Sequence, residues 1–189
     1  SWGGRWRWAA AAADGTAAWF ARTVARRALT IVTDHPANRA CAEGAHDVRL
    51  EFGDGSLARP VTTGLDCQVV ALSATATPRI ERRLHLLFAD PIPASVPFDV
   101  RIDGDTHRVV YAPADSARAI QVNQVGYAPG AAKFAYVGGW LGTAGPLPLD
   151  AERFEVVDQL GRVAYEGPLA LRRAADPWSG NDVYEADFS

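Results

Sequence analysis

Residues 120–139, IQVNQVGYAPGAAKFAYVGG, decide the fold of the C-terminal third of this chain. Apolar Ile120 and Val122 alternate with polar neighbours, as in a strand with one buried face. Phe134 and Tyr136 share one face of a second predicted strand. Glycine and proline punctuate the residues between the two strands and indicate turns. The stretch therefore predicts a pair of β-strands joined by a loop.

The loop between these strands carries side chains suited to contacts at a strand end. Gly126 permits a backbone conformation that is closed to other residues. Tyr127 can bury its ring while its hydroxyl bonds a polar neighbour. The side-chain amides of Asn123 and Gln124 can tie a strand end to a loop. We interpret these polar groups as internal hydrogen-bonding partners rather than as ligand contacts.

The β pattern continues to residue 189. Asp158-Gln159-Leu160-Gly161 has aspartate and glycine at the first and fourth positions of a β-turn. This turn joins predicted strands at 153–157 and 162–165 into a hairpin. Residues 183–188 give a last predicted strand.

Three segments resemble, in the same order, parts of one known domain: IQVNQVGYAPGAAKFAYVGG, FEVVDQLGRVAYEGPL and DVYEADFS. That domain is the N-terminal immunoglobulin-like β-sandwich of family-nine glycoside hydrolases, which are cellulase-type enzymes. The resemblance covers about residues 119–189. In the family, further strands and a helical catalytic barrel follow the Asp-Phe-Ser string. The resemblance therefore implies an incomplete sandwich, truncated before the catalytic domain. The residues that match the family's motif, in structural roles, are Asn123, Gln124, Gly126, Tyr127, Asp187 and Phe188.

The resemblance implies an accessory function. The domain is expected to stabilise and position the catalytic barrel of a parent hydrolase that cleaves β-1,4-glucan with inversion, in polysaccharide catabolism. The barrel is then the main partner, and β-glucan is a second one. The family also favours a secreted or periplasmic bacterial protein. The alternative is a free-standing carbohydrate-binding module.

Residues 48–118 predict a second β-rich unit that ends in a linker. Several short apolar runs are separated by turn signals, which is typical of a small sandwich. Asp103-Gly104 is a strong signal for a hairpin turn. The predicted strands are 48–52, 68–72, 83–88, 98–102 and 108–111.

Residues 1–47 differ from the rest and predict a short helix. Asp14 stands at an N-cap position ahead of residues 15–29. Apolar residues then recur at helical spacing, at Phe20, Val24 and Ala28. The whole pattern predicts a mainly β protein: an immunoglobulin-like sandwich at 119–189, a second sandwich-like unit at 48–118 and a helical segment at 1–47.

Composition and charge exclude some classes of protein. The net charge of -3 argues against a nucleic-acid-binding protein. No stretch approaches the roughly 20 apolar residues of a membrane span, and the alanine run at 9–13 is too short for a signal-peptide core. The chain has no methionine and starts at Ser1, so we expect a processed or truncated product. Cys41 and Cys67 lack metal-ligand spacing, which leaves a disulfide and two free thiols as open alternatives.

The sequence contains no recognisable catalytic machinery. Inverting glycoside hydrolysis needs one protonated and one ionised carboxyl group on either side of the bond, whereas the carboxylates here are scattered over turns. The four histidines show no metal-ligand spacing, so we predict neither a metal nor a cofactor. Trp140 and Trp178 lie in predicted loops, where they can contact a glycan or, as we favour, a neighbouring domain. The scattered carboxylates are Asp54, Asp66, Asp103, Asp105, Asp158 and Asp182.

Overall fold

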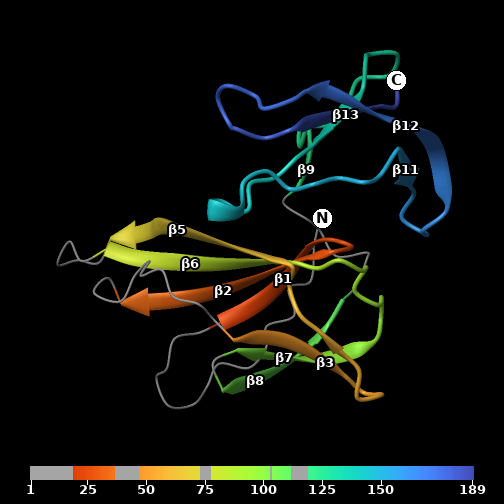
Figure 1. Ribbon diagram of the computed structural model, residues 1–189. Helices are drawn as coiled ribbons and strands as arrows, with labels where there is room; N and C mark the ends of the chain where they lie inside the picture. The colour runs from red at the N-terminus through yellow and green to blue at the C-terminus, as the bar shows by residue number, and fades with distance from the viewer. Residues whose placement is uncertain (1–18, 37–46, 73–77, 103, 112–118) are drawn as a thin grey trace. The chain divides into compact units, whose positions relative to one another are not determined.

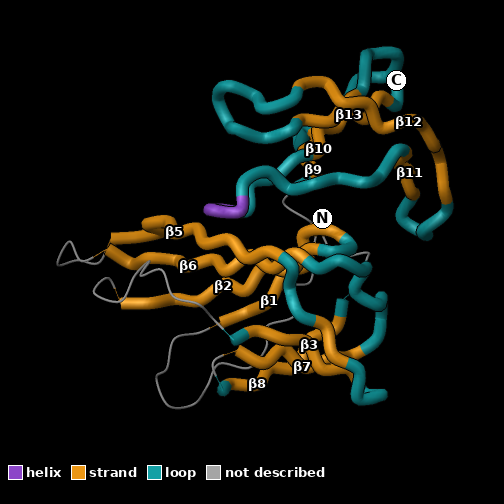
Figure 2. The backbone as a smooth tube through the Cα atoms, in the orientation of Figure 1, coloured by secondary structure: helices purple, strands orange, loops and turns teal. Residues whose placement is uncertain are grey.

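A computed structural model describes residues 19–36, 47–72, 78–102, 104–111 and 119–189 (Figure 1). Strands and loops make up almost all of these residues, with little helix among them (Figure 2). The predicted mainly β fold is confirmed. Among the described residues, no helix has the length and hydrophobicity needed to cross a bilayer.

The chain divides into two compact units. Unit 1 comprises residues 1–117 together with 141–144. Unit 2 comprises residues 118–140 and 145–189.

The first sheet of unit 1 has four antiparallel strands in the order β1-β2-β6-β5. Strand β2 lies inside the sheet, and all five residues from Ala28 to Val32 are buried. Such a continuous buried run indicates a strand that is covered on both faces. The strands are β1 (Trp19–Ala25), β2 (Ala28–Pro36), β5 (Thr62–Leu72) and β6 (Pro78–Leu87).

The predicted helix over residues 15–29 is wrong where the structure describes it. Residues 19–25 form β1, Arg26 and Arg27 form a turn, and β2 begins at Ala28. The helical spacing was coincidental, because strand-favouring Thr30, Ile31 and Val32 follow directly and pair with β6. Long-range pairing outweighs the local helical spacing here. Residues 15–18 of the predicted helix lie outside the described residues.

The second sheet of unit 1 also has four antiparallel strands, in the order β4-β3-β7-β8. Ile102, the last residue of β7, pairs with Asp105, the first residue of β8. Gly104, between these two residues, has a φ of 98°, a conformation that favours glycine. The strands are β3 (Val48–Phe52), β4 (Leu57–Ala58), β7 (Pro97–Ile102) and β8 (Asp105–Val110).

The two sheets of unit 1 share one hydrophobic core. Alternate residues of β3 and β7 are fully buried, as the two-residue period of a strand requires. Phe88, Ile92 and Tyr111 extend the same cluster beyond the strands. The unit is therefore a β-sandwich, as predicted for this part of the chain. The strand residues of the core are Leu29, Ile31, Leu84 and Leu86 from one sheet, and Val48, Leu50, Phe98 and Val100 from the other.

Unit 2 is built on a single antiparallel sheet of five strands in the order β11-β12-β13-β10-β9. Residues 163–168 of β12 pair with β11, whereas residues 169–173 pair with β13. Strand β12 thus pairs with β11 over its first part and with β13 over its second part. The strands are β9 (Ile120–Val122), β10 (Phe134–Val137), β11 (Arg153–Val157), β12 (Val163–Arg173) and β13 (Val183–Asp187).

The sheet of unit 2 has one apolar and one polar face. Directly paired residues project to the same side of a sheet. We define the apolar face by two cross-strand rows, Val122-Ala135-Ala186-Leu169 and Ile120-Val137-Tyr184-Leu171. The opposite face carries Gln121, Tyr136 and Glu185 in one row. The apolar face is not fully covered, because Ile120, Val122 and Leu171 are 57%, 51% and 53% exposed.

Candidate functional site

The Asn123–Tyr127 loop of unit 2 is held by hydrogen bonds within itself. The Asn123 Oδ1 atom accepts the Val125 N–H at 3.0 Å, and its Nδ2 atom donates to the Gly126 carbonyl at 2.9 Å. Gly126 has a φ of 104°, in the left-handed region that favours glycine. Gln124 is exposed and takes no part in these bonds. The Asn123 side chain therefore makes both of these hydrogen bonds within the loop.

Tyr127 connects this loop to two strands and to the C-terminal residues. Its hydroxyl accepts the Asn123 N–H at 3.2 Å and donates to the Phe134 carbonyl. Its ring lies edge-on to Phe188, with the ring centroids 5.4 Å apart. The Phe188 N–H in turn donates to the Lys133 carbonyl at 2.9 Å. The structure thus brings Asn123, Gly126, Tyr127 and Phe188 together.

Asp187 lies in the same region, where its side chain caps the backbone N–H of Ser189. Its Oδ1 atom accepts the Ser189 N–H at 3.0 Å. Hydrogen bonds from the backbone and the hydroxyl of Ser189 lower the pKa of Asp187. An ionised, internally bonded carboxylate suits a structural cap and does not suit a general acid. The structural role that we predict for the motif fits this geometry, and it stays a prediction.

A polar cluster on the other face of the sheet was not predicted from the sequence. The Arg172 guanidinium donates to the Tyr136 hydroxyl at 3.1 Å and to the Glu185 carboxylate. It also lies 5.2 Å from the centre of the Tyr136 ring, a cation–π arrangement. Only the register, which pairs Tyr136 with Glu185, brings these residues together. All three groups satisfy one another, so the cluster has no free reactive group.

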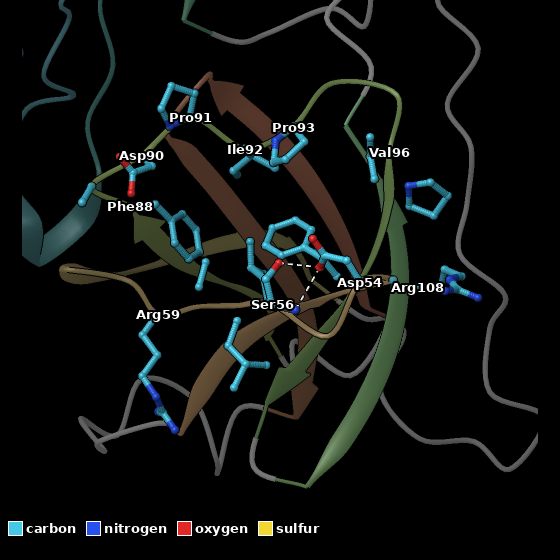
Figure 3. A pocket seen from close by; sticks show the side chains of 17 residues that line it. Asp54, Ser56, Arg59, Phe88, Asp90, Pro91, Ile92, Pro93, Val96 and Arg108 are labelled. Atoms are coloured by element: carbon cyan, nitrogen blue, oxygen red, sulfur yellow. Dashed lines mark hydrogen bonds between the residues drawn. The ribbon is translucent and has the colours of Figure 1, made fainter.

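Unit 1 carries an open groove of about 880 Å³ at the ends of β3 and β4 (Figure 3). Its floor is apolar, formed by buried Leu50, Phe88 and Ile92. Pro91, Ile92 and Pro93 lie along one side in Figure 3, with Ser56 on the other. The groove therefore combines an apolar floor with a polar rim.

Three charged groups at the rim of the groove, Asp54, Arg59 and Arg108, have hydrogen-bond or ion-pair partners. The Asp54 carboxylate accepts the Ser56 N–H at 2.9 Å and the Ser56 hydroxyl at 2.6 Å, and these bonds lower the pKa of Asp54. Arg59 pairs with Asp47 at 2.8 Å, and Arg108 pairs with Asp99 at 3.2 Å. The lowered pKa of Asp54 favours its ionised form, which does not suit a general acid.

Several carboxyl groups of the described chain have lowered pKa values. Every described carboxyl whose pKa is shifted has it shifted downward, by hydrogen bonds and by nearby arginine or lysine: Asp47, Glu51, Asp54, Asp158, Asp176 and Asp187. A general acid for glycoside hydrolysis needs the opposite shift. Across the described ranges, no three His, Cys, Asp or Glu side chains lie close enough to hold a metal ion.

The structure describes one of the two cysteines of the predicted disulfide. Cys67 lies on β5 and is disulfide-bonded. Cys41 lies outside the described residues, so the pairing of these two cysteines stays a prediction.

Comparison with known proteins points to one family. Residues 115–189 match the sequence profile of the cellulase N-terminal ig-like domain. The matched segment includes all five strands of unit 2 and all six motif residues. No curated protein and no solved structure matches the chain.

Proposed function

We propose that unit 2 is an accessory immunoglobulin-like domain of a cellulase-type glycoside hydrolase, of the family-nine kind. In this proposal the chain belongs to a longer parent protein that hydrolyses β-1,4-glucan in polysaccharide catabolism. The domain stabilises and positions the parent's helical catalytic barrel. The match of residues 115–189 to the cellulase N-terminal ig-like domain carries the proposal.

The two faces of the unit 2 sheet support an accessory role. The polar face satisfies its own charged groups through the Arg172–Glu185 pair. The apolar face leaves Ile120, Val122 and Leu171 about half exposed. An apolar surface of this kind gains free energy when a neighbouring domain covers it. Since the described carboxyls supply no acid–base pair, the proposal assigns the chemistry to the parent's barrel.

An antibody raised against the 189-residue chain tests the proposal in the cells that make it. We expect the antibody to precipitate a polypeptide much larger than 20.2 kDa that releases reducing sugar from carboxymethyl-cellulose. A precipitate that contains only a chain of this size, without cellulase activity, would contradict the proposal.

A pair of variants in the parent protein tests the positioning role. Val122→Asp places a charge on the apolar face of β9, whereas Gln121→Asp places one on the opposite face of the same strand. We expect Val122→Asp to lower the temperature at which hydrolase activity is lost, because burying an unpaired charge is costly. Gln121→Asp should leave that temperature nearly unchanged. Equal effects of the two variants would argue against coverage of this face by the barrel.

A further inference from the structure

Trp178 is 92% exposed, although tryptophan is highly buried on average in folded proteins. It lies in the loop that connects β12 to β13, which we define as residues 174–182. Trp140, just after β10, is a second exposed indole of unit 2, at 48%. A ring of this size leaves a large apolar area in water, and a contact that covers it gains free energy.

The 174–182 loop is built to hold Trp178 in place. The Asp176 Oδ2 atom accepts the Trp178 N–H at 3.2 Å, and it accepts the Ser179 N–H and hydroxyl, both at 3.0 Å. The Gly180 N–H donates to the Asp176 carbonyl at 2.7 Å. Asp182 closes the base of the loop by accepting the Ala175 N–H at 2.8 Å. Trp178 is thus fixed through its backbone, which reduces the entropy lost when a ligand binds.

The 174–182 loop packs against Trp140 through Gly180. Gly180 lies directly against the Trp140 ring, since a Cβ atom at Gly180 would approach the ring's Cζ3 atom to 2.9 Å. Gly180 is two residues from Trp178, so their Cα atoms lie within about 7 Å of each other. The close approach at Gly180 therefore packs the loop against Trp140, a few residues from Trp178 in the same loop.

The charges of the loop point to a neutral ligand. Asp176 lies 3.8 Å from the Arg173 guanidinium and is capped by Ser179, while Asp182 is committed to Ala175. Both carboxylates are thus engaged within the loop or with Arg173, which leaves the indole as the group presented to a ligand. The loop therefore offers an exposed indole on a hydrogen-bonded backbone, beside small polar groups. A pyranose ring, with an apolar C–H face and hydroxyls around its edge, is complementary to such a surface.

The size of the surface favours a glycan over a protein partner. A stable protein interface buries about 800 Å² on each side, around an apolar centre. Here polar or small residues flank Trp178, including Ser179 and Gly180. One or two stacked sugar rings need much less apolar area than a protein interface does.

We propose that the 174–182 loop and Trp140 form a β-glucan-binding surface, with the Trp178 indole stacked on a glucose ring. The choice of glucan rests on the proposed function, because a cellulase-type parent works on this polymer. The surface gives the accessory domain its own contact with the polymer, separate from the apolar face that the proposed function assigns to the barrel.

Retention of the purified 189-residue chain on swollen cellulose tests this proposal. We expect saturable binding, and a loss of affinity of about tenfold or more in Trp178→Ala, in line with a lost stacking contact. Trp178→Phe should retain part of the affinity because it keeps a ring. Leu160→Ala is the matched control, since Leu160 is 70% exposed but lies in the β11–β12 turn. All of these side chains are exposed, so each variant should melt at nearly the temperature of the unmodified chain.

Two results would overturn the proposal. One is the absence of saturable retention on cellulose. The other is equal affinity in Trp178→Ala and Leu160→Ala. Binding of the chain to a cellulase-type barrel through Trp178, without retention on cellulose, would also assign the loop to a protein partner. These outcomes are separate from the antibody experiment, which reports on the parent protein and not on this loop.

Discussion

Tyr127 and His85 are polar side chains placed among apolar or backbone neighbours, and each depends on specific partners. Tyr127 supplies one hydroxyl to two strand ends of unit 2. His85 lies on β6 in unit 1, where its Nδ1 atom and the Thr30 hydroxyl share a hydrogen bond of 2.8 Å. Its Nε2 atom is buried and has no hydrogen-bond partner in the described part of the chain. We therefore expect removal of the Tyr127 hydroxyl, or protonation of His85, to lower the free energy of unfolding.

We expect Tyr127→Phe to lower the free energy of unfolding of unit 2 by about 1–2 kcal/mol, because it leaves two backbone groups without their partner. Urea denaturation of the full chain measures this change. Tyr165→Phe is the control, since the Tyr165 ring stacks on Phe154 at 5.8 Å and its hydroxyl makes none of the described hydrogen bonds. Equal destabilisation by the two variants would show that the Tyr127 hydroxyl contributes little.

Burial lowers the pKa of His85 from 6.5 to about 4, with the nearby Asp66 carboxylate opposing this shift and Arg83 adding to it. Between these two values the unfolded chain binds a proton that the folded chain does not bind. The free energy of unfolding of unit 1 should therefore fall as the pH falls through this window, by up to about 1.4 kcal/mol per pH unit.

Urea denaturation at several values between about pH 7 and pH 5 measures this slope. The carboxyls with lowered pKa values lose their contribution only below their ordinary values, so they do not obscure it. His85→Gln should flatten the profile, whereas His107→Gln on β8 should not. A slope that survives in His85→Gln would assign the pH dependence to another group.

Cys67 is disulfide-bonded, and Cys41 is the chain's other cysteine. If they pair, the bond closes a loop of about 25 residues, which chain-entropy arguments value at roughly 3 kcal/mol. Reduction should lower the melting temperature of unit 1, and thiol titration of the denatured, unreduced protein should find no free thiol. Two free thiols in protein from an oxidising compartment would reject the bridge.

At the scale of elements, a 3-10 turn from a distant part of the sequence packs against the first sheet of unit 1. The 3-10 turn η2 (Gly142–Ala144) lies against β5, where the Leu65 N–H donates to the Thr143 hydroxyl at 3.0 Å. The backbones approach so closely that a Cβ atom at Gly64 would lie 1.9 Å from the Leu141 carbonyl oxygen. Gly64 is also the cross-strand partner of His85. Only glycine permits this approach.

Gly142→Ala tests this contact. Gly142 has a φ of 60°, and a Cβ atom there would lie 2.2 Å from the Leu65 carbonyl oxygen. We expect the variant to pay a left-handed backbone cost of about 1 kcal/mol and an additional steric cost of a few kcal/mol. Gly55→Ala in the β3–β4 turn is the control, because Gly55 has a φ of 84° with open space around it.

Thermal unfolding of unit 1 compares the two glycine variants. Gly142→Ala should melt clearly below Gly55→Ala. Similar melting temperatures would show that η2 moves away from β5 at little cost.

For the whole molecule, the prediction concerns hydrolase activity of the isolated chain. We expect the purified chain to release no reducing sugar from carboxymethyl-cellulose or from short β-glucans. The reason is that its shifted carboxyls are shifted toward the ionised form, while a general acid must hold its proton. A colorimetric reducing-sugar assay measures this. Sugar release that is abolished by replacing a single aspartate or glutamate of the chain would contradict the prediction.

Local sequence determined several of the strands and turns of this protein. The alternation around Ile120 and Phe134 predicted β9 and β10, and Asp158 and Gly161 marked the turn between β11 and β12. The sequence also predicted the hairpin turn that precedes Asp105. These features follow from residues a few positions apart, where strand period and turn chemistry act without help from the rest of the fold.

Only the tertiary structure decided the features that depend on distant residues. Residues 19–29 carry a helical spacing, yet β2 pairs with β6 about 50 residues away and becomes the centre of a sheet. Strand register brings Arg172, Tyr136 and Glu185 together. The closure of the 174–182 loop places Gly180 against the Trp140 ring. Burial and cross-strand pairing contribute more free energy than local propensity does, and no short stretch of sequence contains the partners that supply them.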